Sequence, residues 1–192
     1  IVLKKNRLEG FNGTFLASAA RGEHFRGNSS LSLNYKKNNT TVFGSYGYTH
    51  NKREFDLGLE RTIPSEEVGD RVFDQQANLT ETNKTHNYKF GIEQKTSERN
   101  TMLLQFSGDN DKESSLNKSL TDIGPQLGIV DSILTSSSKS ITPFNRYSVN
   151  FNNEFKLDTV GGKVVVDLDW SAFRNNSDIN YEYRTTDAAG DL

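Results

Sequence analysis

Residues 147–157 read YSVNFNNEFKL, and this stretch decides the fold class. Its odd positions are apolar or aromatic except for one asparagine, and its even positions are all polar. A period of two places the two sets on opposite faces of a β-strand, whereas a helix would repeat its apolar residues every three or four positions. The stretch therefore predicts a strand with one apolar face and one face in water.

The same alternation recurs along the chain. In residues 164–172, VVVDLDWSA, the even positions are apolar and Asp167 and Asp169 share the other face, with Phe173 an exception near the end. Three shorter segments alternate in the same way, with Leu103 a misfit: residues 31–35, 88–92 and 102–106. Residues 11–20 and 41–50 are extended but ambiguous, because glycines dilute both faces. We predict seven strands in an all-β, antiparallel up-and-down arrangement.

The connections between these segments alternate in length. Residues 36–40, 94–100 and 158–163 are compact turns rich in Asn, Gly, Ser and charge. The two connections at residues 50–85 and 109–145 are long and polar, and residues 54–59 suggest that such loops begin as projecting strands. Tight turns at one end and long loops at the other are typical of a transmembrane β-barrel. We therefore expect an incomplete barrel segment of about seven strands.

Composition agrees with strands that each show one apolar face. Only 33% of the 192 residues are hydrophobic, yet 12 Phe and 7 Tyr are far more aromatic residues than a disordered chain would carry. The longest aliphatic run is residues 164–166, so a spanning helix, which needs about 20 apolar residues, is excluded. A net charge of −2 gives no argument for nucleic acid. The absence of cysteine removes disulfides, thiolate metal sites and cysteine nucleophiles.

No set of residues predicts catalysis, a cofactor or a metal site. Asp167 and Asp169 could be a general acid and base, but a polar barrel lumen needs such residues without any chemistry. His24, His50 and His86 lack a metal-ligand spacing, and the segment from Asp109 to Glu113 has the alternate acids of a calcium loop without its glycine. We expect no enzyme. The positions that we expect to face the lumen are Asn150, Asn152, Glu154, Asp167 and Asp169.

Four aromatic residues would suit the interfacial girdles of a barrel, namely Tyr35, Tyr88, Tyr147 and Trp170. The same residues could be core aromatics of a soluble sheet. Alternation alone does not separate these two interpretations.

The start of the chain resembles a known family. Residues 1–6, IVLKKN, followed by residues 10–15, GFNGTF, look like the junction in TonB-dependent receptors where the last plug strand passes into the first barrel strand. Residues 32–35, SLNY, and 42–48, VFGSYGY, are similar to the TonB-dependent-receptor-like outer membrane β-barrel proteins of Gram-negative bacteria. The specific resemblance covers about the first fifty residues.

The resemblance implies a plugged barrel of about 22 strands in the cell outer membrane that imports a nutrient with energy from TonB. Residues 1–6 would end the plug domain, and residues 7–192 would form the N-terminal part of the barrel. The partners would be outer-membrane lipid, the plug and remaining strands, the TonB complex through the plug, and an imported ligand; nucleic acid is not expected. Because the chain opens inside an apolar run without Met, we expect a fragment.

Two other classes of protein remain open. A soluble secreted or surface all-β binding module would show the same alternation but should bury its apolar face. A smaller complete barrel would need a closing strand, and we identify none.

Overall fold

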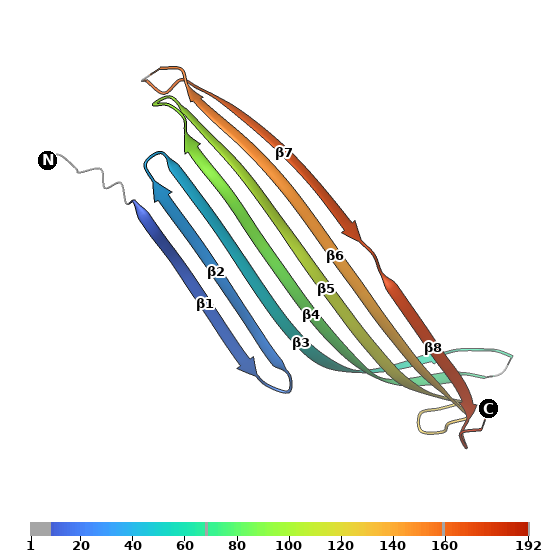
Figure 1. Cartoon of the computed structure of the whole chain (residues 1–192). Helices are drawn as coiled ribbons and strands as arrows, with labels where there is room; N and C mark the ends of the chain where they lie inside the picture. Colours follow the sequence, from blue (N-terminus) through green and yellow to red (C-terminus); the bar gives the residue numbers. More distant parts are fainter. Residues whose placement is uncertain (1–8, 68, 159, 192) are drawn as a thin grey trace. The chain divides into compact units, whose positions relative to one another are not determined.

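The computed structural model describes residues 9–67, 69–158 and 160–191, and every regular element in them is a β-strand (Figure 1). The prediction of an all-β antiparallel fold is confirmed. The strands are β1 (Gly10–Arg21), β2 (Phe25–Lys37), β3 (Thr40–Ile63), β4 (Arg71–Lys95), β5 (Asn100–Gly124), β6 (Ser132–Lys156), β7 (Lys163–Asn175) and β8 (Asp178–Asp187).

The strands form one sheet in sequence order, β1 to β7, and β8 pairs with β6. Consecutive strands from β1 to β7 are joined by hairpin connections, so the topology is up-and-down. Within the described residues β1 pairs only with β2, so the sheet is not closed. An unclosed sheet of this topology is consistent with an incomplete barrel. The count is eight strands rather than the predicted seven: in β8, Ile179, Tyr181 and Tyr183 alternate with polar residues, a pattern that our prediction did not include.

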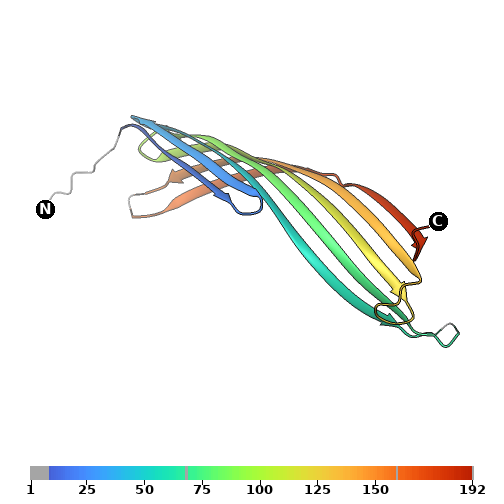
Figure 2. The same cartoon turned by 90° about the horizontal axis from the view of Figure 1, so that it is seen from below.

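The chain divides into two units. The first contains residues up to His50, Lys84–Asp111 and Phe144–Asn175, and the second contains Asn51–Asn83, Lys112–Pro143 and residues from Asn176 onward. Strands β3 to β6 contribute to both units, since each is 24 or 25 residues long. Each unit is a single layer of strands (Figures 1 and 2).

The predicted short turns are present, and their chemistry explains them. The hairpin between β2 and β3 turns at Asn38 and Asn39, with Lys37 paired to Thr40. Asn38 has a φ of 50°, a left-handed conformation that asparagine tolerates better than most residues. In the turn after β6, the Asp158 carboxylate accepts hydrogen bonds from the backbone N–H groups of Val160, Gly161 and Gly162.

The prediction of two long loops is wrong. Most of residues 50–85 belongs to β3 and β4, and most of residues 109–145 belongs to β5 and β6. The real connections are residues 64–70 and 125–131. Except at Phe55, Leu57 and Leu59 of β3, these strand extensions are rich in Ser, Thr, Asn and charge on both faces, so most of their length lacks the apolar alternation that identifies a half-buried strand. Backbone pairing needs no such pattern. The suggestion that residues 54–59 are extended is confirmed, since they lie in β3.

Pro143 lies opposite the interval between β7 and β8. The register of β6 with β7 ends at Phe144 and Asn175, and that with β8 begins at Ile141 and Asp178. The Pro143 carbonyl still accepts a hydrogen bond from the N–H of Asn176, 3.3 Å away, but proline has no N–H to return. One missing ladder donor therefore accounts for the interruption.

No hydrophobic side chain is buried among the described residues. Leu168 and Trp170, for example, are each 60% exposed. A soluble domain of this size would cover such residues, because burying one large apolar side chain contributes about 1.5–3 kcal/mol. Among the residues that the structure describes, no covering layer lies against this apolar surface.

Candidate membrane and lumen surfaces

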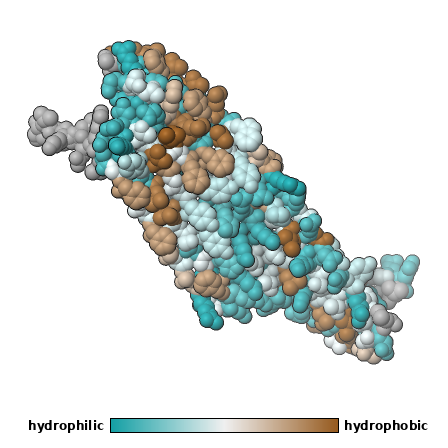
Figure 3. Space-filling model, viewed as in Figure 1, coloured by the Kyte–Doolittle hydropathy of each residue, from teal (hydrophilic) through white to brown (hydrophobic). Residues whose placement is uncertain are grey.

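The strands of the first unit share one apolar face. Register places Phe11 beside Tyr35 and Tyr35 beside Val42 across β1, β2 and β3. On the other side of the unit, Phe151 pairs with Leu168 between β6 and β7. The Phe90 ring would contact a Cβ added at Gly44, and the Phe106 ring stacks on Tyr147, which place β4 and β5 on the same face. We call this surface the apolar face; Figure 3 shows apolar and aromatic residues gathered over these strands.

The apolar face is about as tall as a membrane. Its residues on β6 extend from Tyr147 to Phe155 and on β7 from Val164 to Ala172, about nine residues each. A tilted strand that spans a bilayer needs about 9–11 residues. The height of the apolar face therefore matches the length of a strand that spans a bilayer.

A network of aromatic and amide side chains crosses one end of the apolar face. The Tyr46 hydroxyl and His86 Nδ1 are 2.7 Å apart, and the His86 and Tyr48 ring centroids are 4.8 Å apart. Further along, the Tyr88 hydroxyl donates to Asn110 Oδ1 at 3.0 Å, and Asn110 Nδ2 donates to Tyr147 Oη and Asn145 Oδ1. We call this set the tyrosine belt: Tyr46, Tyr48, His86, Tyr88, Asn110, Asn145 and Tyr147. Rings with a polar tip are typical of a boundary between apolar and wet surroundings.

The opposite face of the first unit is polar and connected by charge-assisted hydrogen bonds. Asn150 Nδ2 donates to one carboxylate oxygen each of Asp167 and Asp169, at 2.7 and 2.8 Å. Arg146 forms an ion pair with Asp109, from β6 to β5. Lys163 Nζ lies 3.0 Å from Glu154 Oε2. We call this surface the polar face.

All five residues expected at the lumen lie together on the polar face. Register pairs Asn150 with Asp169 and Asn152 with Asp167, and Glu154 is on the same side of β6. That this face lines the lumen of a barrel stays a prediction. The ion pair of Arg146 with Asp109 is not predicted by the sequence, because residues 109–145 are expected to form a loop, whereas Asp109 lies in β5. The alternation of β5 continues through Asp109, and that signal could have placed it.

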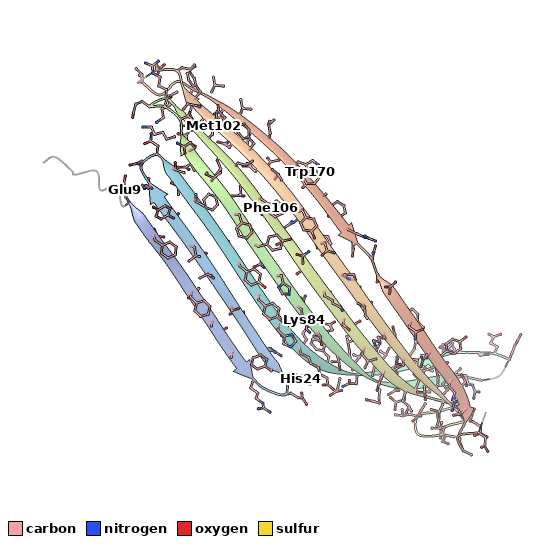
Figure 4. All side chains as sticks on the ribbon, in the orientation of Figure 1. Glu9, His24, Lys84, Met102, Phe106 and Trp170 are labelled. Carbon is pink, nitrogen blue, oxygen red and sulfur yellow. The ribbon has the colours of Figure 1, made fainter. Side chains whose placement is uncertain are left out.

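The expected girdle residues divide into three positions. Tyr88 and Tyr147 belong to the tyrosine belt. Tyr35 lies near the opposite end of the apolar face, between Phe11 and Val42. Trp170 lies beside Val149 on the apolar face, and Figure 4 labels it on β7.

Two aromatic exceptions on the polar face have structural reasons. The Phe43 ring covers Gly91, where any added Cβ would collide with it. Phe173 stacks on Phe144, with ring centroids 6.4 Å apart. Gly91 thus leaves room for the Phe43 ring to be half-buried, whereas Phe173 stays 75% exposed beside Phe144.

Polar side chains, some of them in ion pairs, connect the strands of the second unit. Arg53 bonds Glu81 at 2.7 Å while lying over the Phe55 ring at 5.3 Å. Asn78 Nδ2 donates to the carboxylates of Glu54 and Asp56, at 2.6 and 2.9 Å. Of the described side chains of this unit, only Ser119 and Thr121 are buried polar groups, and Ser119 bonds Ser136 across β5 and β6.

No metal centre is assembled by the residues that the structure describes: they contain no group of three or more His, Asp or Glu side chains placed to hold an ion. Asp109, Asp111 and Glu113 lie in strand β5 rather than in the expected solvated loop. The described residues form no helix of the length and apolar character that crossing a membrane requires.

The first six residues, which carry part of the resemblance to the plug junction, lie outside the described residues. No protein-family model matches the chain, and no curated protein matches its sequence.

Proposed function

We propose that this chain is a wall segment of an outer-membrane β-barrel receptor that takes up a nutrient with energy from TonB. In this proposal the apolar face of the first unit contacts lipid and the polar face lines the lumen. Residues 7–192 form the N-terminal part of the barrel, and the edges of β1 and of β7 with β8 pair with further strands of the same protein. No step of the proposal requires catalysis.

The observation that carries the proposal is the unburied apolar face. Seven neighbouring strands present apolar side chains on one side, and none of the described hydrophobic residues is buried. In water this surface would drive association, because exposed apolar patches of that extent mark a contact with a partner or a membrane. A face about nine residues tall bordered by a tyrosine belt favours the membrane.

The alternative is a soluble all-β binding module. Such a domain packs a second layer against its apolar face to form a core. The described residues form one layer in each unit, so this alternative must supply the covering layer from elsewhere. That requirement makes it the weaker proposal.

Localisation of the full-length protein tests the proposal. We expect recovery in the outer-membrane fraction and, in intact cells, protease cuts at residues 64–70 and 125–131. The turns at residues 38–39, 96–99 and 157–162 should be protected because they lie on the periplasmic side. Recovery in a soluble fraction, or cuts at both sets of turns, would contradict the proposal.

The transport part needs its own measurement. We expect uptake of the nutrient to stop in a strain without TonB and to weaken when residues 64–70 or 125–131 are shortened, since these loops and the second unit are the part we expect to meet the ligand. Unchanged uptake in the strain without TonB and in the variants with shortened loops would mean that the barrel wall has a role other than this transport.

A further inference from the structure

The charged residues on the apolar face all have one sign. Among the described strand residues of the first unit, this face carries no Asp or Glu, and its cations are Arg21, Lys37, Lys84 and Arg174. The polar face of the same strands carries both signs, as in the pair of Asp109 with Arg146. A chance distribution over strands with this many carboxylates would not leave one face without any.

Three of these four cations lie at the same end. Arg21 is the last residue of β1 and pairs with Phe25, and Arg174 pairs with Asn145 of the tyrosine belt. Lys84 lies two residues from His86 on β4, on the same side of the strand. Figure 4 shows Lys84 nearer than Phe106 to the end of the unit marked by His24. Lys37 lies at the other end, beside the turn at Asn38.

The three side chains are exposed and available to an anion. Among the described residues none of Arg21, Lys84 and Arg174 makes a side-chain ion pair or hydrogen bond. They stand on β1, β4 and β7, and each is separated from the next by three strand spacings, or about 14 Å. One small anion cannot bridge such distances, whereas a row of lipid headgroups can meet each cation separately.

We propose that Arg21, Lys84 and Arg174 bind the phosphate groups of anionic lipid headgroups in the leaflet at the tyrosine-belt end. This inference rests on the proposed function, in which that leaflet is the outer one. Long basic side chains at the end of a membrane-spanning segment extend toward the lipid headgroups. Each Lys or Arg near an anionic surface contributes about a fivefold preference for it.

The test uses full-length protein reconstituted in phosphatidylcholine vesicles that contain lipid A, a phosphorylated glycolipid. After mild detergent extraction, the ratio of lipid A to phosphatidylcholine retained by the protein is compared with the ratio in the bulk. We expect lipid A to be enriched around the wild type. The triple variant R21Q/K84Q/R174Q should lose the enrichment, and R21K/K84R/R174K should keep it.

The matched control is K36Q/K89Q/K156Q, which removes the same charge from the polar face of the same unit. It should retain lipid A as the wild type does. Equal loss in both triple variants, or no enrichment by the inserted wild type, would overturn this inference and leave the barrel proposal intact. Failure of the wild type to insert in any vesicle would overturn both.

Discussion

At the scale of single residues, side-chain contacts between neighbouring strands hold the polar face of the first unit. Asn150 donates hydrogen bonds to Asp167 and Asp169 because the register of β6 with β7 places the three residues on one side of the sheet. Alternation could not explain Phe43, because the reason is a glycine on another strand, Gly91, that leaves room for the ring. A contact between residues so far apart in the chain depends on strand pairing, which local pattern does not specify.

The contact of Phe43 with Gly91 gives a prediction. A methyl group in Gly91→Ala collides with the Phe43 ring, so we expect the free energy of unfolding to fall by about 1–3 kcal/mol. Denaturant unfolding of the reconstituted protein measures it. Gly58→Ala is the control, since its added Cβ meets the Gln76 amide at an ordinary 3.5 Å. Equal effects of the two substitutions would show that Phe43 does not occupy the space over Gly91.

The turn at Asp158 gives a second prediction. Hydrogen bonds from the backbone N–H of Gly162 first, then Val160 and Gly161, lower the pKa of this carboxyl group. Because the folded pKa is depressed, the turn is stabilised above the ordinary aspartate pKa, and the stabilisation is lost as the pH falls through the folded value. Amide exchange at residues 160–162 should stay slow until strongly acid pH. Asp158→Ala should exchange quickly at neutral pH; equally slow exchange would contradict the assignment.

At the scale of elements, the sequence indicated strand cores but not strand ends. Apart from Phe55, Leu57 and Leu59 of β3, the segments of β3 to β6 in the second unit show little apolar alternation, so the sequence predicts loops over most of their length. Their pairing is made by backbone hydrogen bonds and side-chain bonds such as Ser119 to Ser136. β8 differs from these segments, since Ile179, Tyr181 and Tyr183 give it an apolar alternation that our prediction did not include. Hydrophobic periodicity reflects the surroundings of a strand, and it is absent where both faces of the strand lie in water.

The break between β7 and β8 tests the role of Pro143. Pro143→Ala supplies the missing N–H, so we expect one new ladder hydrogen bond and a gain of about 0.5–1.5 kcal/mol in the free energy of unfolding. Hydrogen exchange at the amides of Asn176 and Ser177 should slow in the variant. Thr142→Ala, which removes a 3.1 Å hydroxyl contact with Ser177, should act in the opposite direction. Unaltered exchange in Pro143→Ala would mean that the interruption has another cause.

The two faces of β7 should respond differently to charge. Leu168→Arg places a cation near the middle of the apolar face, and we expect a loss of about 2–4 kcal/mol of folding free energy in a bilayer. Val165→Arg puts the same charge on the polar face, opposite Glu154, and should cost about 1 kcal/mol or less. Folding into vesicles monitored in denaturant measures both. A larger cost for Val165→Arg would reverse the assignment of the faces.

At the scale of the whole molecule, the account depends on what covers the apolar face. The sheet is not closed and none of the described hydrophobic residues is buried, so both features require surroundings that the described residues do not provide. The sequence could predict the apolar face itself, since it follows from alternation strand by strand. What lies against that face could not be predicted, because lipid and a second protein layer select the same side chains.

Spin labels on β7 test this claim most directly. These 192 residues contain no cysteine, so single-cysteine variants at residues 164–172 can be labelled one at a time in vesicles, in full-length protein from which any cysteine elsewhere has been removed. The account predicts that oxygen, which concentrates in lipid, reaches the labels at 164, 166, 168, 170 and 172, and that a water-soluble nickel chelate reaches those between them. Labels at the even positions that are shielded from oxygen, or open to the chelate, would show that the apolar face does not contact lipid.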